Sequence, residues 1–212
     1  MIKHIIWDWN GTLFNDVEMS VSVMNSILKE RKLPIMTVEY YRSIFTFPVV
    51  DYYKKLNLNF KEEPFEIVGK IFIDRYEERK GESSLHKNVN SLLNELKENS
   101  IQQSILSAYS QVTLEKILVY HNIHSYFSNV VGLSHIYADS KIENGKKLIS
   151  KLDHNKDEIL FIGDTVHDFE VAEELGIKSI LFAKGHQSEE TLRRTGVPVI
   201  NEITEMKNYL EI

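Results

Sequence analysis

Short apolar runs recur along the chain and are typical of buried strands. The runs cover residues 2–7, 103–106, 129–132, 158–162, 178–181 and 197–200. Between the later runs, apolar residues return at helical spacing, as at residues 111–121, 144–152 and 168–175. Strands that alternate with helices through short connections are typical of right-handed βαβ units. The pattern therefore predicts an α/β fold with a parallel sheet.

Residues 15–84 break this alternation. They contain no clear buried strand, and the segments 17–32 and 64–80 repeat their apolar residues at helical spacing. Pro34, Pro48 and Pro64 separate the helical patterns, and residues 89–99 resume the alternation. We predict an inserted all-helical cap domain at residues 15–84, after the first strand of a Rossmann-like core that consists of residues 1–14 and 85–212.

Composition narrows the class of protein. The 212 residues are enough for one domain with an insert, and 42% of them are hydrophobic, which supports a substantial core. The net charge is -6 without a cluster of Lys or Arg, which argues against nucleic acid as the main partner. The chain has no cysteine, so disulfides and thiolate metal sites are excluded.

The chain also shows no sign of a targeting or membrane segment. The apolar run at the start is too short for a signal peptide and contains Asp8 early. No stretch approaches the roughly 20 apolar residues of a membrane span. We expect a soluble cytoplasmic protein without a membrane partner.

Polar residues that could carry chemistry follow the apolar runs. They are the string DWNGT (Asp8 to Thr12), Ser107, Lys141, and the pair Asp164 and Asp168. Because the carboxyl ends of parallel strands meet at one edge of a sheet, we expect these residues to converge. Trp7 and Trp9 flank Asp8; Trp7 is most simply a core residue, and Trp9 could wall the site.

These residue types suit the transfer of a phosphate group to a carboxylate. Asp8 as nucleophile would form an aspartyl phosphate, and a divalent cation has to bridge the two anions. Mg²⁺ prefers oxygen ligands, which Asp8, Asp164 and a backbone carbonyl just past Asp8 could supply. A hydroxyl such as Ser107 and an ammonium such as Lys141 could donate to the phosphoryl oxygens.

With these motifs the chain resembles the haloacid dehalogenase superfamily, on its phosphatase side. DWNGT is similar to the first motif of that family, Asp-x-Asp-Gly-Thr, except at the third position. Ser107, Lys141 and the string from Gly163 to Asp168 match its second, third and fourth motifs. The helical segment after the first strand resembles the inserted cap of the phosphoglycolate-phosphatase-like branch. The resemblance covers nearly the whole chain.

The resemblance implies a Mg²⁺-dependent phosphatase that acts on a small phosphorylated substrate, as a monomer or homodimer. The implied metal residues are Asp8, Asn10 through its backbone carbonyl, Asp164 and Asp168. Asp8 would also be the nucleophile, and Asp168 would orient a metal-bound water or Lys141.

The resemblance also implies which residues hold the substrate phosphate. They are Ser107, Lys141 and Thr12. Lys141 is also counted among the catalytic residues, with Asp8 and Asn10.

Asn10 departs from the family pattern. In the family an Asp at this position protonates the leaving oxygen and then activates the hydrolytic water, and an amide can do neither. Three interpretations stay open: the enzyme uses good leaving groups such as acyl or aryl phosphates or anhydrides, another group is the acid, or the chain binds phosphate without turnover. His167 is the nearest candidate acid, although a solvent-facing loop residue is the favoured interpretation of this histidine. An engineered substitution would also explain Asn10.

Other classes of protein remain as alternatives. A non-catalytic phosphate-binding or regulatory module is supported by Asn10 alone. A receiver-type signalling domain also phosphorylates an Asp on an α/β sheet, but the long helical insert and Asp164 argue against it. A phosphomutase would still need an acid and a base for its hydroxyl groups.

Overall fold

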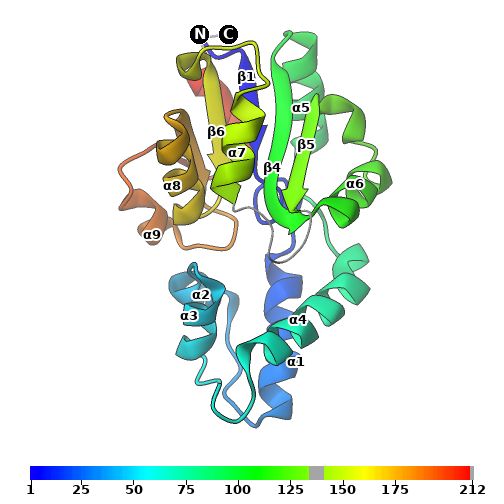
Figure 1. The fold of residues 1–212 in the computed structure, drawn as a ribbon, viewed down its shortest axis with the longest axis vertical. Coiled ribbons are helices and arrows are strands. Elements are labelled where there is room, and N and C mark those ends of the chain that lie inside the picture. The colour runs from blue at the N-terminus through cyan, green and yellow to red at the C-terminus, as the bar shows by residue number, and fades with distance from the viewer. Residues whose placement is uncertain (134–140, 211–212) are drawn as a thin grey trace.

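The protein has the predicted parallel sheet. A computed structural model describes residues 1–133 and 141–210 (Figure 1). Six parallel strands form one sheet in the order β5-β4-β1-β6-β7-β8. Their bounds are β1 His4–Trp7, β4 Gln102–Ser110, β5 Asn129–Leu133, β6 Ile159–Gly163, β7 Lys178–Phe182 and β8 Val199–Ile200. Each strand lies on one of the predicted runs, so the predicted α/β fold is confirmed.

Helices cover both faces of the sheet. Ile5 and Trp7 of β1 belong to one hydrophobic core and Ile6 to another, as the two-residue period of a strand requires. The first core is packed by α5 (Val89–Glu98), α6 (Gln111–Tyr120) and the 3₁₀ helix η4 (Ile203–Tyr209). The second is packed by α7 (Lys141–Ile149) and α8 (Val166–Leu175).

Shorter elements complete the connections around the sheet. They are α9 (Glu189–Arg193), η2 (His124–Tyr126) and η3 (Lys156–Glu158). Among the described residues, no helix combines the length and the apolar character needed to cross a membrane.

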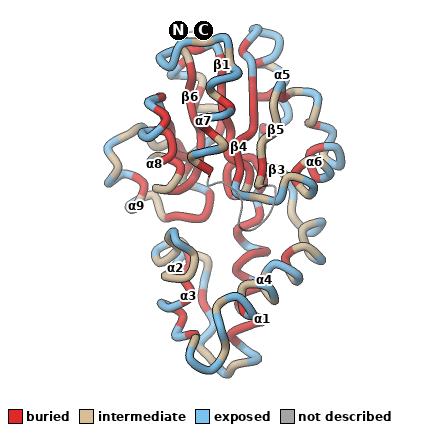
Figure 2. Tube along the Cα trace, viewed as in Figure 1, coloured by how far each residue is buried: buried red, intermediate tan, exposed pale blue. Residues whose placement is uncertain are grey.

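A separate group of helices is inserted between β1 and β4. It consists of α1 (Val17–Glu30), α2 (Val38–Ile44), α3 (Val49–Lys55), α4 (Phe65–Arg79) and the short η1 (Lys80–Glu82). We call α1–α4 the helical insert. It lies beyond the carboxyl ends of the sheet strands (Figure 1). Its buried side chains form their own hydrophobic core, so buried and exposed stretches alternate along it (Figure 2).

Two short strands that were not predicted join the insert to the rest of the chain. β2 (Phe14–Asn15) and β3 (Ser84–Leu85) pair antiparallel where the chain enters and leaves the insert. Strands of two residues are too short for any alternation of apolar and polar positions to reveal them. The predicted division after residues 14 and 84 falls within this ribbon, and the division itself stays a prediction.

Candidate active site

The predicted site residues lie at the carboxyl ends of neighbouring strands. Asp8 directly follows β1, and its backbone N–H donates to the carbonyl oxygen of Ile162 in β6 (2.8 Å). Asp164 directly follows β6. Ser107 lies in β4, on the other side of β1, where the pairing of β4 with β5 becomes irregular. Three adjacent strands therefore bring residues from distant parts of the sequence to one edge of the sheet.

Four buried side chains form an acidic cluster, which we define as Asp8, Lys141, Asp164 and Asp168. Each of the three carboxylates has an oxygen within 4.8 Å of an oxygen of the other two. The ammonium of Lys141, the first residue of α7, donates to Asp8 Oδ1 and to Asp168 Oδ1, the latter at 2.6 Å. All four side chains are almost inaccessible to solvent. One ammonium therefore faces three carboxylates.

This unequal number of charges shifts the pKa values in the cluster. Burial raises the pKa of Asp8, and it raises the pKa of Asp164 to about 8. Burial acts on Asp168 too, but the adjacent Lys141 outweighs it and lowers the pKa of Asp168. Burial alone would lower the pKa of Lys141, yet Asp168 and Asp8 together raise it. Buried negative charge in excess is costly unless a cation or protons neutralise it.

The residues present fit a magnesium ion. Asp8 and Asp164 offer carboxylate oxygens, and among the described residues none donates a hydrogen bond to the backbone carbonyl of Asn10. Asp168 is placed differently from the other two acids. Its Oδ1 binds Lys141, and its Oδ2 accepts from the backbone N–H groups of Asp164 (3.1 Å) and Thr165 (3.0 Å). Asp168 therefore holds Lys141 and the Asp164 loop in place.

Two glycines allow the backbone to pass close to Asp164. Gly11 has φ +76°, in the left-handed region, and a Cβ atom at this position would lie 2.3 Å from Asp164 Oδ2. A Cβ atom at Gly185 would lie 2.2 Å from the same oxygen. Neither position has space for a side chain, so the DWNGT string and the loop after β7 are both held against Asp164.

The two predicted phosphate-binding hydroxyls have different partners. The fully buried Thr12 hydroxyl donates to Asp164 Oδ1 (3.0 Å) and lies 3.4 Å from Asp8 Oδ2. The Ser107 oxygen accepts from the backbone N–H of Tyr109 (3.1 Å), which leaves its own hydrogen free to donate. Their roles at a phosphate group stay predictions.

A second buried polar group connects the helical insert to the sheet edge. We define this junction cluster as Asn10, Asp16, Tyr41, Tyr76 and His186. Asp16 Oδ2 accepts from Asn10 Nδ2 (2.9 Å) and from the Tyr76 hydroxyl (2.7 Å). Asn10 Nδ2 also donates to the Tyr76 oxygen (2.7 Å). The amide that departs from the family pattern is thus a structural partner of α4 and of the residue that precedes α1.

His186 was missed at the sequence level. Its Nε2 lies 3.2 Å from Asp16 Oδ1, its Nδ1 lies 2.7 Å from the Tyr41 hydroxyl, and its backbone N–H donates to Asp164 Oδ2 (2.6 Å). Burial alone would lower the pKa of His186, but the Asp16 carboxylate outweighs burial and raises it to about 9. Asp16 and His186 therefore form a buried ion pair at neutral pH. The signal was available, because His186 follows β7 at the same edge of the sheet.

The loop after β7 also contacts the insert directly. The Arg42 guanidinium donates to the carbonyl oxygens of Gly185 (2.9 Å) and Lys184 (2.8 Å). Gln187 Nε2 donates to the Phe45 carbonyl (3.0 Å), while Gln187 Oε1 accepts from the backbone N–H of Val166 (2.6 Å). These bonds hold α2 and the segment after it against the edge of the sheet that carries the acidic cluster.

Two other residues are placed differently from what the sequence suggested. His167 is not a solvent-facing loop residue: it lies on α8, half-buried, with its ring 4.8 Å from the ring of Phe47 in the insert. Trp9 does not wall the site. It is fully buried in the core and stacks on Phe14 with ring centroids 5.1 Å apart.

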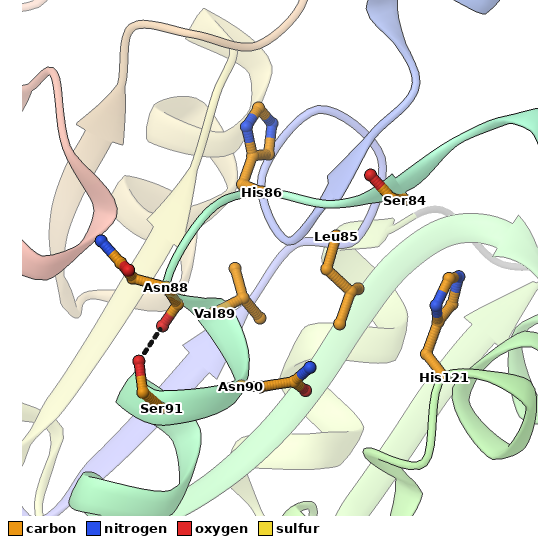
Figure 3. A pocket seen from close by; sticks show the side chains of 8 residues that line it. All are labelled: Ser84, Leu85, His86, Asn88, Val89, Asn90, Ser91 and His121. Atoms are coloured by element: carbon orange, nitrogen blue, oxygen red, sulfur yellow. Dashed lines mark hydrogen bonds between the residues drawn. The ribbon is translucent and has the colours of Figure 1, made fainter.

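A surface cavity of about 430 Å³ lies where the chain leaves the insert and enters α5 (Figure 3). It is lined by Ser84, Leu85, His86, Asn88, Val89, Asn90, Ser91 and His121. His86 points away from Asn90 and His121, and its Nε2 donates to the carbonyl oxygen of Gly11 (3.1 Å). The lining contains no acid, lysine or arginine, so it offers neither a carboxylate nucleophile nor carboxylate ligands for Mg²⁺.

Comparison with known families defines the class of protein. Residues 5–182 match the model of the haloacid dehalogenase-like hydrolases. The chain therefore belongs to this family, and the resemblance seen in the sequence is confirmed.

Solved structures with the same fold cover the chain from end to end. A haloacid dehalogenase-like hydrolase from Streptococcus pneumoniae has a TM-score of 0.84 at 22% identity, with 99% of each chain covered. A predicted phosphatase from Clostridium acetobutylicum has a TM-score of 0.82 at 20% identity, with 100% of each chain covered. A predicted phosphoglycolate phosphatase from Haemophilus somnus has a TM-score of 0.78 at 20% identity, covering 99% of this chain and 98% of its own. No curated protein matches the sequence.

Proposed function

We propose that the protein is a Mg²⁺-dependent phosphatase that hydrolyses a small phosphomonoester through an aspartyl phosphate. One observation carries the proposal: the Asp8 carboxylate lies at a strand end within a buried group of three carboxylates and one ammonium. Membership of a hydrolase family supports hydrolysis. The predicted phosphatases among the structural relatives support phosphate as the transferred group.

Each member of the site has a distinct task in this proposal. Asp8 attacks the phosphorus atom and is later freed by water. Ser107 and Lys141 donate to the phosphoryl oxygens, and Asp168 keeps Lys141 in place. A bound Mg²⁺ held by Asp8, Asp164 and the Asn10 carbonyl would neutralise charge between nucleophile and phosphate.

The helical insert suits the role of a cap. Its contacts with the loop after β7, through Arg42 and Gln187, place it over the edge of the sheet that carries Asp8. A cap in this position excludes bulk water and limits the size of the substrate. We infer a small phosphorylated compound as substrate.

The test is a screen of phosphate esters with and without Mg²⁺, run on the natural chain and on Asp8→Asn. Hydrolysis is expected to need Mg²⁺ and to fall by about 10⁴-fold or more in Asp8→Asn, because the nucleophile is lost. Asp153→Asn makes the same chemical change at an exposed position and should leave the rate unaltered. Equal activity in Asp8→Asn and the natural chain would contradict the proposal.

A second candidate function rests on Asn10. The chain could be a catalytically weakened or non-catalytic phosphate-binding or regulatory member of the same fold, since an amide cannot transfer a proton. Binding of Mg²⁺ and inorganic phosphate by a chain that hydrolyses none of the esters would favour this candidate.

A further inference from the structure

We propose that the substrate is an activated phosphate, in which the phosphoryl group is joined to the oxygen of an acidic leaving group: an acyl phosphate, an aryl phosphate or a phosphoanhydride. The inference rests on the proposed phosphatase function and narrows its substrate class. It follows from how the described groups around Asp8 are engaged: once Mg²⁺ has displaced any proton from Asp164, no acidic group among them is directed at a leaving oxygen.

Asn10 is the first group to consider, because it follows the nucleophile by two residues. A carboxylate only accepts hydrogen bonds, so the nitrogen end of the Asn10 amide must be the end that faces Asp16. Asp16 Oδ2 and the Tyr76 oxygen, which are themselves hydrogen-bonded, both lie within 2.9 Å of Nδ2, so the amide nitrogen is turned toward this pair. Asn10 therefore offers the leaving oxygen no proton, because an amide does not release one and its nitrogen faces the junction cluster.

The nearby histidines do not fill this gap. Both ring nitrogens of His186 have partners, Asp16 Oδ1 on one side and the Tyr41 hydroxyl on the other. A proton on His186 is thus directed into the junction cluster. The ring of His167 lies against the ring of Phe47, and it forms no hydrogen bond with a described residue that would orient a proton.

The Ser107 hydroxyl has a free hydrogen but is too weak an acid to protonate a leaving oxygen. The other donors near Asp8 are held by carboxylates. The Lys141 ammonium lies between the carboxylates of Asp8 and Asp168. The Thr12 hydroxyl donates to Asp164, and the Tyr76 hydroxyl donates to Asp16. Each of these protons stabilises a buried carboxylate, so moving it to a substrate would leave that carboxylate unpaired.

Transfer of the phosphoryl group to Asp8 needs no proton donor when the leaving group is stable as an anion. An Asp8 oxygen forms a bond to phosphorus, and the bond from phosphorus to the leaving oxygen breaks with its electron pair. The leaving group departs as a carboxylate, phenolate or phosphate and needs no proton. Water then attacks the phosphorus of the aspartyl phosphate, which releases the Asp8 carboxylate and inorganic phosphate, and the water proton goes to phosphate or solvent.

The test compares acetyl phosphate, p-nitrophenyl phosphate, phenyl phosphate and ethyl phosphate in the natural chain and in Asn10→Asp. The measured quantity is kcat/KM, which covers the steps up to departure of the leaving group and excludes the later attack of water. The added carboxyl group would lie next to Asp16, and the like charge of that carboxylate favours the protonated form of the new group, so the variant supplies an acid. The gain of Asn10→Asp on ethyl phosphate should exceed its gain on p-nitrophenyl phosphate by about 10²-fold or more.

Three results decide the matter. The proposal is supported if kcat/KM falls steeply from acetyl to ethyl phosphate in the natural chain and falls less steeply in Asn10→Asp. Equal gains on all four compounds, or a natural chain that hydrolyses ethyl phosphate as fast as acetyl phosphate, overturn the leaving-group inference while the phosphatase function stands. Turnover of none of the compounds overturns both. Asn90→Asp is the matched control, because it changes an exposed amide to an acid in the first turn of α5. If Asn10→Asp does not fold, the fall of kcat/KM from acetyl to ethyl phosphate in the natural chain still decides the matter.

Discussion

The acidic cluster and the junction cluster both take residues from the segment between β1 and α1. They differ in how their buried charges are balanced. The acidic cluster places three carboxylates beside one ammonium, so it keeps an excess of buried negative charge. The junction cluster pairs the single carboxylate of Asp16 with His186 and surrounds it with neutral donors from Asn10 and Tyr76.

The difference fits the proposed cation site on one side and a structural connection on the other. An unbalanced buried cluster is destabilising until a cation or protons neutralise it, which is what a metal site must tolerate. A balanced cluster has no excess charge, so the empty protein does not need a ligand to neutralise it. The balance of buried charge therefore indicates that the acidic cluster, and not the junction cluster, is the candidate site for a cation.

The largest expected effect is the loss of the one ammonium from the acidic cluster. Lys141→Met keeps the length of the side chain but leaves three buried carboxylates, which should destabilise the metal-free protein by about 3–5 kcal/mol. Urea unfolding in EDTA and in Mg²⁺ measures this, and Mg²⁺ should restore much of the loss. Lys146→Met on the same helix removes an exposed ammonium and should change little. An unchanged urea midpoint for Lys141→Met in EDTA would mean that the cluster is not short of positive charge.

A smaller effect is expected from pH. Asp164 has its pKa raised from 3.8 to about 8 and His186 from 6.5 to about 9 in the folded chain, so both hold a proton there that they lose in the unfolded chain. The stability that these two protons give the folded chain is complete below the pKa values of the unfolded chain. It is lost as the pH rises through the pKa values of the folded chain. The free energy of unfolding of the metal-free protein should therefore fall by about 2 kcal/mol or more between about pH 6 and pH 9.

Addition of Mg²⁺ and the variant His186→Gln show how much of this pH dependence comes from each cluster. Mg²⁺ replaces protons in the acidic cluster, so it should remove the part due to Asp164. His186→Gln should remove the part due to the junction cluster and leave the response to Mg²⁺. A urea midpoint that rises with pH in EDTA would contradict the direction assigned to both groups.

The smallest effect is expected at Tyr76. Tyr76→Phe removes one hydrogen bond to Asp16 and one from Asn10, which should cost about 1–2 kcal/mol of stability without weakening Mg²⁺ binding. Calorimetric Mg²⁺ titration and urea unfolding check the two parts. Tyr53→Phe is the control, because the equally buried Tyr53 has no hydrogen bond from its hydroxyl to a described residue. A variant that loses Mg²⁺ affinity would show that the two clusters are not separate.

The acidic cluster was predictable because strand ends converge. Asp8 and Asp164 each follow an apolar run, and parallel topology requires those runs to end at one edge. The junction cluster was only partly predictable. The strand before His186 places that residue at the same edge. Its meeting with Asp16 and Tyr76 depends on the position of the insert, which no local pattern encodes. Trp9 could have been placed correctly: it continues the two-residue period of Ile5 and Trp7, and all three lie in the same core.

Gln187 connects the loop that carries Asp164 with the helical insert. One amide holds the backbone of Val166, beside Asp164, and the backbone of Phe45 in the insert. We therefore expect binding of a cation at the acidic cluster and docking of the insert to be linked equilibria, and linkage is reciprocal. A cation that tightens the Asp164 loop would hold the insert more firmly by the same free energy, and a chain with a docked insert would bind that cation more tightly than one with a loose insert.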